Sequence, residues 1–553
     1  MDFAHYIKEH KKKLVIFCLL LFVFLTPRLL GTSLPYHQDE WKNVSASRSV
    51  ATAGAFFAHP PLMQMIFVAS NFILGDQNMR LLPLFFSVAS IVLLYIVVSR
   101  RIGERAALWS ALLFAFCFYN ILGSLSPDVD GAILPFFFLL SVYAYDRKLL
   151  PLLTISLLIG LLVKLSFILV VGTILVDYLW QERKVLNTKK IFFSSLALLA
   201  FGALYMAILY FIKAVYPAFD MNIMLGHANQ YTGELGRNWI QIIVQGVKSL
   251  QYLSPLLLVP LLFINKDIFK KTRIFFVYLL LGLIFYFVLF DFSRAALDKY
   301  LMFTILPLSV ICGAILANIF NSESNISNKQ KTFSVLFGFA LAFLLFTLNF
   351  LTHSIPSLYP KTEWFSKVAH LQWNILNPFH GGSGPLGFYV SFLFIATSFI
   401  ASILLGLIGY FKKEWRFQVS ITLIIVGLSY NIFFAEELLV GRVNGSAPKV
   451  LREATSFING NSKIKEVITY NDIGGYELSK EKKYAGRIYA TPESEDGYRK
   501  KFAEYTKNKI GYFLVVDIPR INPKSFYGQY FASCQTEFQS KSGEIEAKVY
   551  SCR

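Results

Sequence analysis

The chain has 553 residues, of which 55% are hydrophobic and 16% are charged, and its mean hydropathy is +0.52. Average soluble proteins carry roughly 25% charged residues, so the composition excludes a soluble globular enzyme and predicts a protein that crosses a membrane many times. The net charge of +19 does not indicate a nucleic-acid partner, because no compact basic region with interleaved aromatic residues and no nucleic-acid motif accompanies it.

The N-terminus predicts a retained membrane helix. Lys8 and three consecutive lysines, Lys11 to Lys13, precede an apolar run over residues 14–30, and no small-residue cleavage site follows before Pro35. By the positive-inside rule the N-terminus is cytoplasmic and the loop after residue 30 lies outside the membrane.

The remaining spans are placed so that every Lys/Arg-rich connection between them lies on the cytoplasmic side of the membrane. The run 62–75 is shorter than the roughly 20 residues that cross a bilayer, so we interpret it as a juxtamembrane or half-inserted helix on the outer face. About thirteen spans are then expected, at residues 14–30, 81–99, 106–122, 131–145, 149–163, 165–180, 191–212, 247–264, 274–291, 300–320, 332–352, 386–410 and 417–434. The predicted fold class is a mainly α, polytopic membrane helix bundle over residues 1–440.

The outer loops 31–80 and 123–131 are long enough to hold catalytic groups, and residues 441–553 predict a small α/β domain outside the membrane. That segment alternates a helix at 449–458, a strand at 467–470, a helix at 493–506, a strand at 512–517 and a hairpin. The protein is thus expected to be a multi-pass protein of the cell membrane with an extracytoplasmic C-terminal domain.

Two of the five cysteines, Cys534 and Cys552, flank the two alternating runs of the C-terminal hairpin, which turns at residues 541–543. A hairpin brings its ends together, so a disulfide is expected, and it requires an oxidising compartment. Two free thiols are the alternative. The other three cysteines lie in apolar runs and are expected to be buried small hydrophobes.

Acidic residues mark both outer loops. Asp39 and Glu40 follow the first span, where a carboxylate could be a general base or where Asp39 could cap a helix over 40–50. Asp128 and Asp130 precede an apolar run, and carboxylates at the mouth of a span are costly unless they are solvated, paired or functional. Between them, His59 begins a His-Pro-Pro-Leu element that could start a helix or donate to an anion.

The ordered set of these elements resembles the C-type glycosyltransferases. An Asp-Glu pair after the first span, the His-Pro-Pro-Leu element, a short apolar helix, Arg80-Leu-Leu-Pro and Pro127-Asp128 occur in that order over residues 14–164. The resemblance is to the branch that contains protein O-mannosyltransferases and the lipid A aminoarabinose transferase. It implies a polyprenyl-phosphate-linked sugar donor and transfer to an acceptor on the outer face.

The resemblance also assigns residues. Asp39 matches the catalytic aspartate, with Glu40 as its companion, and Asp128 matches the second-loop acid, with Asp130 as a substitute. Further matches are His59 in the proline element and Arg80 after the juxtamembrane helix, and a looser basic-aromatic segment comprises Arg294, Lys299 and Tyr300.

Direct displacement needs a base on one side of the sugar and cations around the departing phosphate. We therefore expect Asp39 to be the base and Asp128 to orient or bind substrate. The expected phosphate-binding cations are His59, Arg80, Lys164, Arg294 and Lys299. For Lys164, snorkelling from a short helix is the alternative.

No cofactor is expected, because the donor sugar arrives activated. A divalent cation would bind only if the fold gathered Asp39, Glu40 and Asp128. The expected partners are the polyprenyl-phosphate sugar donor, a lipid, glycan or protein acceptor, and membrane lipids, with no nucleic acid.

Two other function classes compete with this interpretation. A secondary transporter or flippase-like protein of envelope lipids would also have many spans, but transporters concentrate ionisable groups near the midplane and show inverted repeats. In this chain the acids cluster at outer span ends and an outer domain is appended, which favours an enzyme. A non-catalytic lipid-binding or assembly protein would be favoured if the two acidic loops proved far apart.

Overall fold

The computed structural model describes residues 3–48, 59–183, 188–232, 238–290, 298–322, 326–351, 353–356, 362–379, 386–488, 502–503, 505 and 511–552. It contains two compact units. One comprises Met1–Thr32, Asn43–Asn328 and Gly406–Ser420, and the other comprises Ser33–Lys42, Lys329–Leu405 and Ile421–Arg553. The predicted boundary between residues 440 and 441 stays a prediction.

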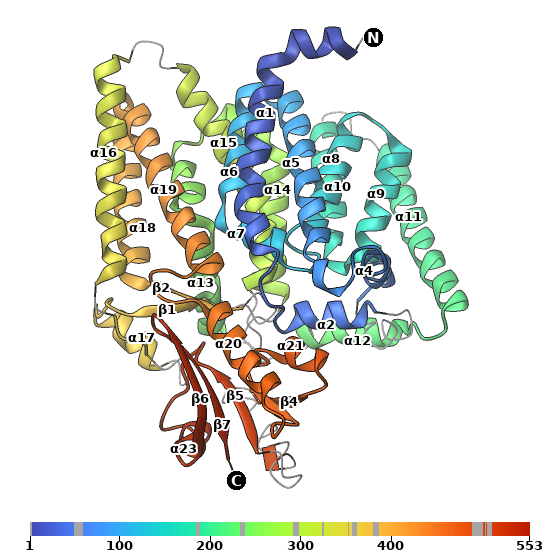
Figure 1. Ribbon diagram of the computed structural model, residues 1–553. Helices are drawn as coiled ribbons and strands as arrows, with labels where there is room; N and C mark the ends of the chain where they lie inside the picture. Colours follow the sequence, from blue (N-terminus) through green and yellow to red (C-terminus); the bar gives the residue numbers. More distant parts are fainter. Residues whose placement is uncertain are drawn as a thin grey trace. The chain divides into compact units, whose positions relative to one another are not determined.

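The first unit is a helix bundle (Figure 1). Its helices are α1 (Phe3–Gly31), α4 (Pro61–Leu74), α5 (Leu81–Arg101), α6 (Glu104–Phe116), α7 (Phe118–Leu125), α8 (Ile133–Asp146), α9 (Leu150–Val163), α10 (Ile168–Glu182), α11 (Thr188–Val215), α12 (Met221–Thr232), α13 (Trp239–Leu258), α14 (Lys266–Ile284) and α15 (Ile305–Ser322). Helix α2 (Asp39–Ala46) belongs to both units, and short 3₁₀ segments include η2 (Leu165–Phe167) and η5 (Asp298–Thr304).

Helices α6 and α15 form the centre of this bundle. A Cβ atom added to Gly313 of α15 would lie 2.6 Å from the backbone nitrogen of Ser110 in α6, so only a glycine allows this approach. Further along the same contact the rings of Trp109 and Phe320 stack with centroids 5.2 Å apart. Close backbone approach through small residues is typical of helices that pack without a hydrophobic driving force from water.

A helix or helical pair lies at each predicted span, with two corrections. The span predicted at 106–122 is broken at Cys117, where α6 and α7 meet at an angle of 65°. Cys117 has extended backbone angles, and the side-chain amide of Asn120 donates to the carbonyl oxygen of Phe114 at 2.8 Å, which satisfies a backbone acceptor that the break exposes.

The other correction concerns the span predicted at 386–410. Its first residues form strand β2 (Phe388–Ser391), which pairs antiparallel with β1 (Leu376–Phe379), and the helix α18 starts only at Phe392. Aromatic and β-branched residues in Phe388–Ser391 suit a strand as well as an apolar span, so composition alone did not separate the two.

Within the described residues, nine helices are long and apolar enough to cross a membrane, or ten if the bent pair α6 and α7 is one span. The shorter apolar helices are Cys18–Gly31, Pro61–Leu74, Ile133–Asp146 and Leu150–Val163. The prediction of a multi-pass membrane protein is therefore confirmed. The count of about thirteen spans and the orientation of the termini stay predictions.

The second unit contains α16 (Asn328–Thr347), α17 (Thr362–Ala369), most of α18 (Phe392–Phe411) and of α19 (Arg416–Leu439), β1, β2 and a C-terminal α/β region. In that region a five-stranded sheet has the order β4-β3-β5-β7-β6. Its strands are β3 (Val467–Tyr470), β4 (Tyr484–Ile488), β5 (Tyr512–Val516), β6 (Gln535–Ser542) and β7 (Ile545–Ser551), and its helices are α20 (Ala447–Gly460), α21 (Gly475–Lys480) and α23 (Phe526–Ala532).

Each face of this sheet packs against a hydrophobic cluster. Alternate residues point to opposite faces of a strand, so Leu514 packs in the cluster that contains α20, whereas Phe513 packs in the cluster that contains Phe531 of α23. The strand β3 pairs in parallel with β4 and β5, and β7 pairs antiparallel with β5 and β6. This confirms a small C-terminal sheet domain.

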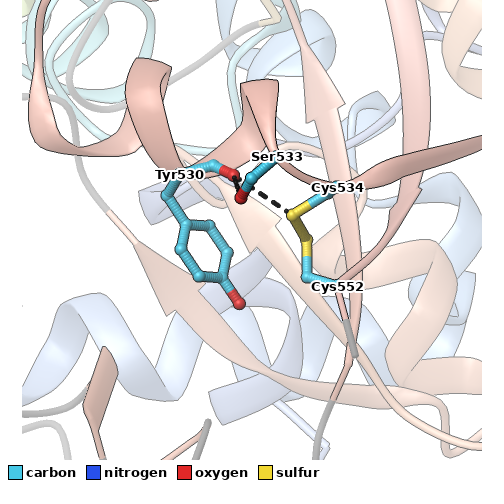
Figure 2. The surroundings of a disulfide bond; sticks show 4 residues. All are labelled: Tyr530, Ser533, Cys534 and Cys552. Carbon is cyan, nitrogen blue, oxygen red and sulfur yellow. Dashed lines mark hydrogen bonds between the residues drawn. A yellow bond between two sulfur atoms is a disulfide. The ribbon is translucent and has the colours of Figure 1, made fainter.

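The predicted hairpin and its disulfide are present. Strands β6 and β7 pair antiparallel, and the sulfur atoms of Cys534 and Cys552 are bonded at 2.04 Å (Figure 2). The predicted strands at 467–470 and 512–517 and the helix at 449–458 also occur. The helix predicted at 493–506 lies mostly outside the described residues, and α21, β4 and α23 were not predicted.

Candidate functional site

The loop over residues 123–131 is held in a tight reversal between α7 and α8. A Cβ atom added to Gly123 would lie 2.7 Å from the Cα of Gly131, and one added to Gly131 would overlap the backbone of Gly123. The two glycines therefore let the ends of the loop touch. Asp128 and Asp130 lie on the loop closed by this contact, so both carboxylates are positioned by it.

Two lysines from distant parts of the chain pair with these carboxylates. The ammonium of Lys299, in η5, lies 2.9 Å from Oδ2 of Asp128, and that of Lys164 lies 2.5 Å from Oδ2 of Asp130. Lys164 has extended backbone angles at the break between α9 and η2. It is 8% exposed, so the snorkelling alternative does not describe its position.

An aromatic ring links the two ion pairs. The Nζ atoms of Lys164 and Lys299 lie 4.5 Å and 5.4 Å from the ring centroid of Tyr300, within the range of a cation–π interaction. The ring of Tyr286 in turn stacks on Tyr300, with centroids 5.9 Å apart. We call Asp128, Asp130, Lys164, Lys299 and Tyr300 the charge cluster.

The two carboxyl groups of the cluster differ in proton affinity. Burial alone would raise the pKa of Asp128, but the charges of Lys299 and Lys164 outweigh it and hold that pKa below its ordinary value. Burial raises the pKa of Asp130 above its ordinary value despite the facing Lys164, and the charge of Asp128 adds to the rise. One acid is thus held ionised more firmly than its neighbour, a difference that active sites use to separate roles.

Two buried arginines form hydrogen bonds to the end of α7, just before the loop that contains Asp128 and Asp130. Arg80, at the start of α5, is fully buried and its Nη1 donates to the carbonyl oxygen of Leu125 at 2.5 Å. Arg28, in the last turn of α1, is also fully buried, and its Nε donates to Ser124 Oγ at 2.8 Å. Both arginines therefore hold the end of α7, where the loop with the two carboxylates begins.

The acids of the loop 31–80, Asp39 and Glu40, lie on α2, within the unit that also contains the C-terminal sheet. The Asp39 carboxylate is partly exposed and pairs with Lys42 at 3.1 Å. Glu40 is fully buried, and its Oε2 accepts from the backbone N–H of His37 at 3.1 Å. Asp39 is the first residue of α2, so the sequence placed the start of this helix correctly to within one residue.

Other parts of the first loop belong to the bundle. Asn43 in α2 donates to the carbonyl oxygen of Pro127 at 3.0 Å, next to Asp128, and Asn71 of α4 donates to Ser47 Oγ at 2.8 Å. His59 lies half-buried in the bend before α4. Arg294 lies outside the described residues.

The structure thus brings together five of the residues selected from the sequence, which are those of the charge cluster. The sequence analysis did not select Arg28, Tyr278 or Tyr286. Both tyrosines are nevertheless neighbours of the cluster, because they line a small cavity together with Asp130. The ring of Tyr286 also stacks on that of Tyr300. An arginine inside an otherwise apolar span is a signal that could have identified Arg28.

The described part of the chain contains no set of side chains arranged to bind a metal ion. There, no three side chains of His, Cys, Asp or Glu are grouped so that they could hold an ion. The carboxylates of Asp128 and Asp130 face ammonium groups instead.

An apolar groove adjoins the same 3₁₀ segment that holds Lys299. The groove has a volume of about 260 Å³ and is formed by α13, α14 and η5, with Leu250, Leu253, Phe287, Leu301 and Thr304 among its lining residues. Leu301 and Lys299 are two positions apart in η5, so one short segment contributes to both the charge cluster and the apolar surface.

Comparisons with known proteins give a structural match but no match in sequence. No protein-family model and no curated protein sequence matches the chain. The structure is similar to that of ArnT from Cupriavidus metallidurans bound to undecaprenyl phosphate, with a TM-score of 0.55 and 14% identity over 98% of both chains. ArnT from the same organism in the apo state gives a TM-score of 0.53 at 14% identity, again over 98% of both chains. ArnT is the lipid A aminoarabinose transferase, so the chain has the C-type glycosyltransferase fold that its sequence motifs predicted.

Proposed function

We propose that the protein transfers a sugar from a polyprenyl-phosphate-linked donor to a lipid, glycan or protein acceptor on the outer face of the membrane. In this proposal the N-terminus is cytoplasmic and residues 441–553 are extracytoplasmic. The observation that carries the proposal is that η5 contributes Lys299 to the charge cluster and Leu301 to an apolar groove of the same unit. Lys164 lies beside Lys299 in that cluster, since both ammonium groups contact the ring of Tyr300. A lipid phosphate combines these two chemistries, an anion and an apolar chain. The undecaprenyl phosphate bound to ArnT supports a ligand of this class.

The proposed reaction is a single displacement at the anomeric carbon. An acceptor hydroxyl or amine forms a bond to that carbon while the bond to the phosphate oxygen breaks, and the polyprenyl phosphate leaves with the bonding electron pair. The acceptor's proton passes to the carboxylate of Asp39, which is partly exposed and lies 3.1 Å from the ammonium of Lys42. Glu40 supports the loop through its bond to the His37 amide.

The leaving phosphate gains charge as the bond breaks, and fixed cations stabilise that charge. Lys164 and Lys299 are proposed as its principal ligands, with His59, Arg80 and Arg294 completing the positive surroundings. Before the donor binds, Asp130 and Asp128 neutralise the two lysines. Asp128, the more firmly ionised acid, is proposed to orient Lys299 or to bind a sugar hydroxyl, and Tyr300 to pack against the donor.

The direct test is transfer by the purified protein. The protein in lipid nanodiscs would be supplied with a panel of radiolabelled polyprenyl-phosphate sugars and membrane extract, and the label would be followed to its acceptor. Asp39→Asn is expected to lower turnover at least about 100-fold, whereas Asp76→Asn, which changes an acid of the same loop that pairs with Arg48 at 2.7 Å, should retain activity. Normal turnover by Asp39→Asn would remove the base assignment. Transport of an unmodified substrate without any transfer would instead support a secondary transporter.

The phosphate-binding role has its own test. Lys299→Gln should raise the KM for the lipid-linked donor about tenfold, which is the effect of losing roughly one charge-assisted contact. Lys271→Gln is a matched control, because Lys271 is an exposed lysine paired with Asp267 at 2.8 Å. Equal KM values for Lys299→Gln and the wild type would refute the assignment.

A further inference from the structure

The first turn of α2 and the residues just before it dock on the C-terminal sheet domain. The indole Nε1 of Trp41 donates to Oδ2 of Asp472 at 3.3 Å, and the side-chain amide of Gln38 donates to the carbonyl oxygen of Asn471 at 3.4 Å. More than 400 residues separate the partners of each bond, which are 431 and 433 positions apart. All four residues belong to the same compact unit.

Aromatic contacts reinforce this docking. The ring of Tyr36 meets Tyr476 of α21 edge to face, with centroids 4.8 Å apart. The ring of Trp41 meets Tyr484 of β4 in the same manner at 5.7 Å. Edge-to-face pairs of this kind stabilise a contact beyond the area they bury. The docking therefore combines directed hydrogen bonds with apolar contact on both sides of Asp39.

Asp472 is the centre of the contact. Its side chain is completely buried, and its carboxylate accepts a hydrogen bond from the hydroxyl of Tyr484 at 2.7 Å as well as from Trp41. Arg487 supplies the counter-charge through an ion pair with the same carboxylate. A buried carboxylate with several donors and a counter-ion is held in one orientation, so the bond to Trp41 has a fixed direction.

The backbone is unusual at this same place. Gln38, Asn471 and Asp472 have φ values of +44°, +53° and +67°, a left-handed region that non-glycine residues seldom adopt. All three take part in the docking contacts. Strained backbone of this kind persists only where surrounding contacts over-determine it, and it concentrates at functional sites.

Helix α2 itself has eight residues. Helices shorter than about 12–15 residues are marginal in water on their own, so external contacts must set its direction. Trp41 and Asp39 are two positions apart on this helix, and Trp41 is bound by the sheet domain while Asp39 remains partly exposed beside Lys42. Any rotation of α2 that broke the Trp41 bond would also redirect the Asp39 carboxylate.

We propose that Asp472 is a positioning residue for the reaction, which acts through Trp41 to aim the Asp39 carboxylate at the acceptor. The inference rests on the proposed role of Asp39 as the base. In this proposal the C-terminal domain takes part in the reaction, because its residue Asp472 fixes the direction of the Asp39 carboxylate. Misplacement of a reacting group by about 1 Å can cost roughly 100-fold in rate, so even a small rotation of α2 would be measurable.

The kinetic test compares Trp41→Phe, which removes the indole N–H and keeps an aromatic ring, with Asp472→Asn. Each variant is expected to lower kcat about tenfold with an unchanged KM for the lipid-linked donor, since α2 moves but the lysines do not. Because both substitutions break one connection, the double variant should be no slower than the slower single variant. The control is Asp517→Asn, which removes the partner of Arg520, bonded at 2.9 Å in the same domain, without contacting α2.

Hydrogen exchange gives a readout that does not depend on activity. In Trp41→Phe and Asp472→Asn the amides of residues 39–46 should exchange faster than in the wild type, and in Asp517→Asn they should not. Unchanged exchange in both test variants, additive losses in the double variant, or an equal loss of kcat in Asp517→Asn would each overturn the positioning role. Normal transfer by Asp39→Asn combined with faster exchange in Asp472→Asn would overturn Asp39 as the base and retain the docking, so the two failures are distinguishable.

Discussion

The ammonium of Lys164 lies 2.5 Å from the Asp130 carboxylate, and both groups are buried. Two charges removed from water stabilise each other only as a pair, because either one alone would keep its desolvation cost without compensation. Removing one partner of the pair is therefore expected to destabilise the folded protein much more than removing both partners.

Lys164→Met is expected to lower the free energy of unfolding by about 3–5 kcal/mol, since it leaves Asp130 buried without a counter-charge. Adding Asp130→Leu should restore most of the melting temperature but not the transfer activity, because the phosphate-binding cation is still absent. Melting of the purified protein in detergent measures the first effect. Lys190→Met, at an exposed lysine paired with Glu182, serves as the control, and equal melting temperatures for the single and double variants would contradict the prediction.

Gly131→Ala tests the loop reversal. The added methyl group would overlap the backbone of Gly123, so the ends of the loop must separate and the carboxylates of Asp128 and Asp130 must shift. We expect a loss of about 1–3 kcal/mol in stability, as for other overpacked sites, and a larger loss in turnover. Gly202→Ala is the control, because a Cβ atom at Gly202 meets nothing within 4 Å. Wild-type turnover in Gly131→Ala would show that the close approach does not position the acids.

His37 predicts a pH dependence of stability. Burial lowers the pKa of His37 to about 4 against the attraction of Asp472 and Asp39, and its Nδ1 has no hydrogen-bond partner within the described residues. The unfolded chain binds a proton at His37 near pH 6.5, whereas the folded protein binds it only near pH 4. Between these values the unfolded state holds more protons, so stability falls as the pH falls, by about 3 kcal/mol in total.

Melting temperatures measured from pH 7 to pH 4.5 check this dependence. His37→Gln should show a weaker acid loss than the wild type, because the substituted side chain does not titrate. The exposed His370 of α17's C-terminal turn gives the matched variant His370→Gln, which should follow the wild type. Parallel pH curves for His37→Gln and the wild type would refute the prediction.

The disulfide predicts a defined loss on reduction. Cys534→Ser should lower the stability of the C-terminal sheet domain by about 2–4 kcal/mol, the usual effect of opening a cross-link of this kind. The two residues are 18 positions apart. Proteolysis of the purified protein with and without reductant measures the loss, and Cys18→Ser, at an exposed free cysteine, should change nothing. Equal proteolysis rates in the two conditions would contradict a stabilising role.

The sequence by itself determined the membrane class, most helix positions and the C-terminal disulfide. These features depend on local composition: an apolar run needs no partner to be recognised, and a hairpin brings its own ends together. The same holds for the order of motifs from Asp39 to Asp128, which predicted the fold. Local composition failed at Cys117, where a side-chain bond from Asn120 stabilises a break, and at Phe388–Ser391, where pairing with β1 replaces helix.

The tertiary structure decided which charges meet. Lys299 is 171 positions from Asp128, and Lys164 is 34 positions from Asp130, so no spacing rule pairs them. The docking of Trp41 on Asp472 likewise joins residues that are 431 positions apart. Such partners are chosen by burial, because a charge or an indole N–H removed from water must find whichever complementary group the fold brings within reach.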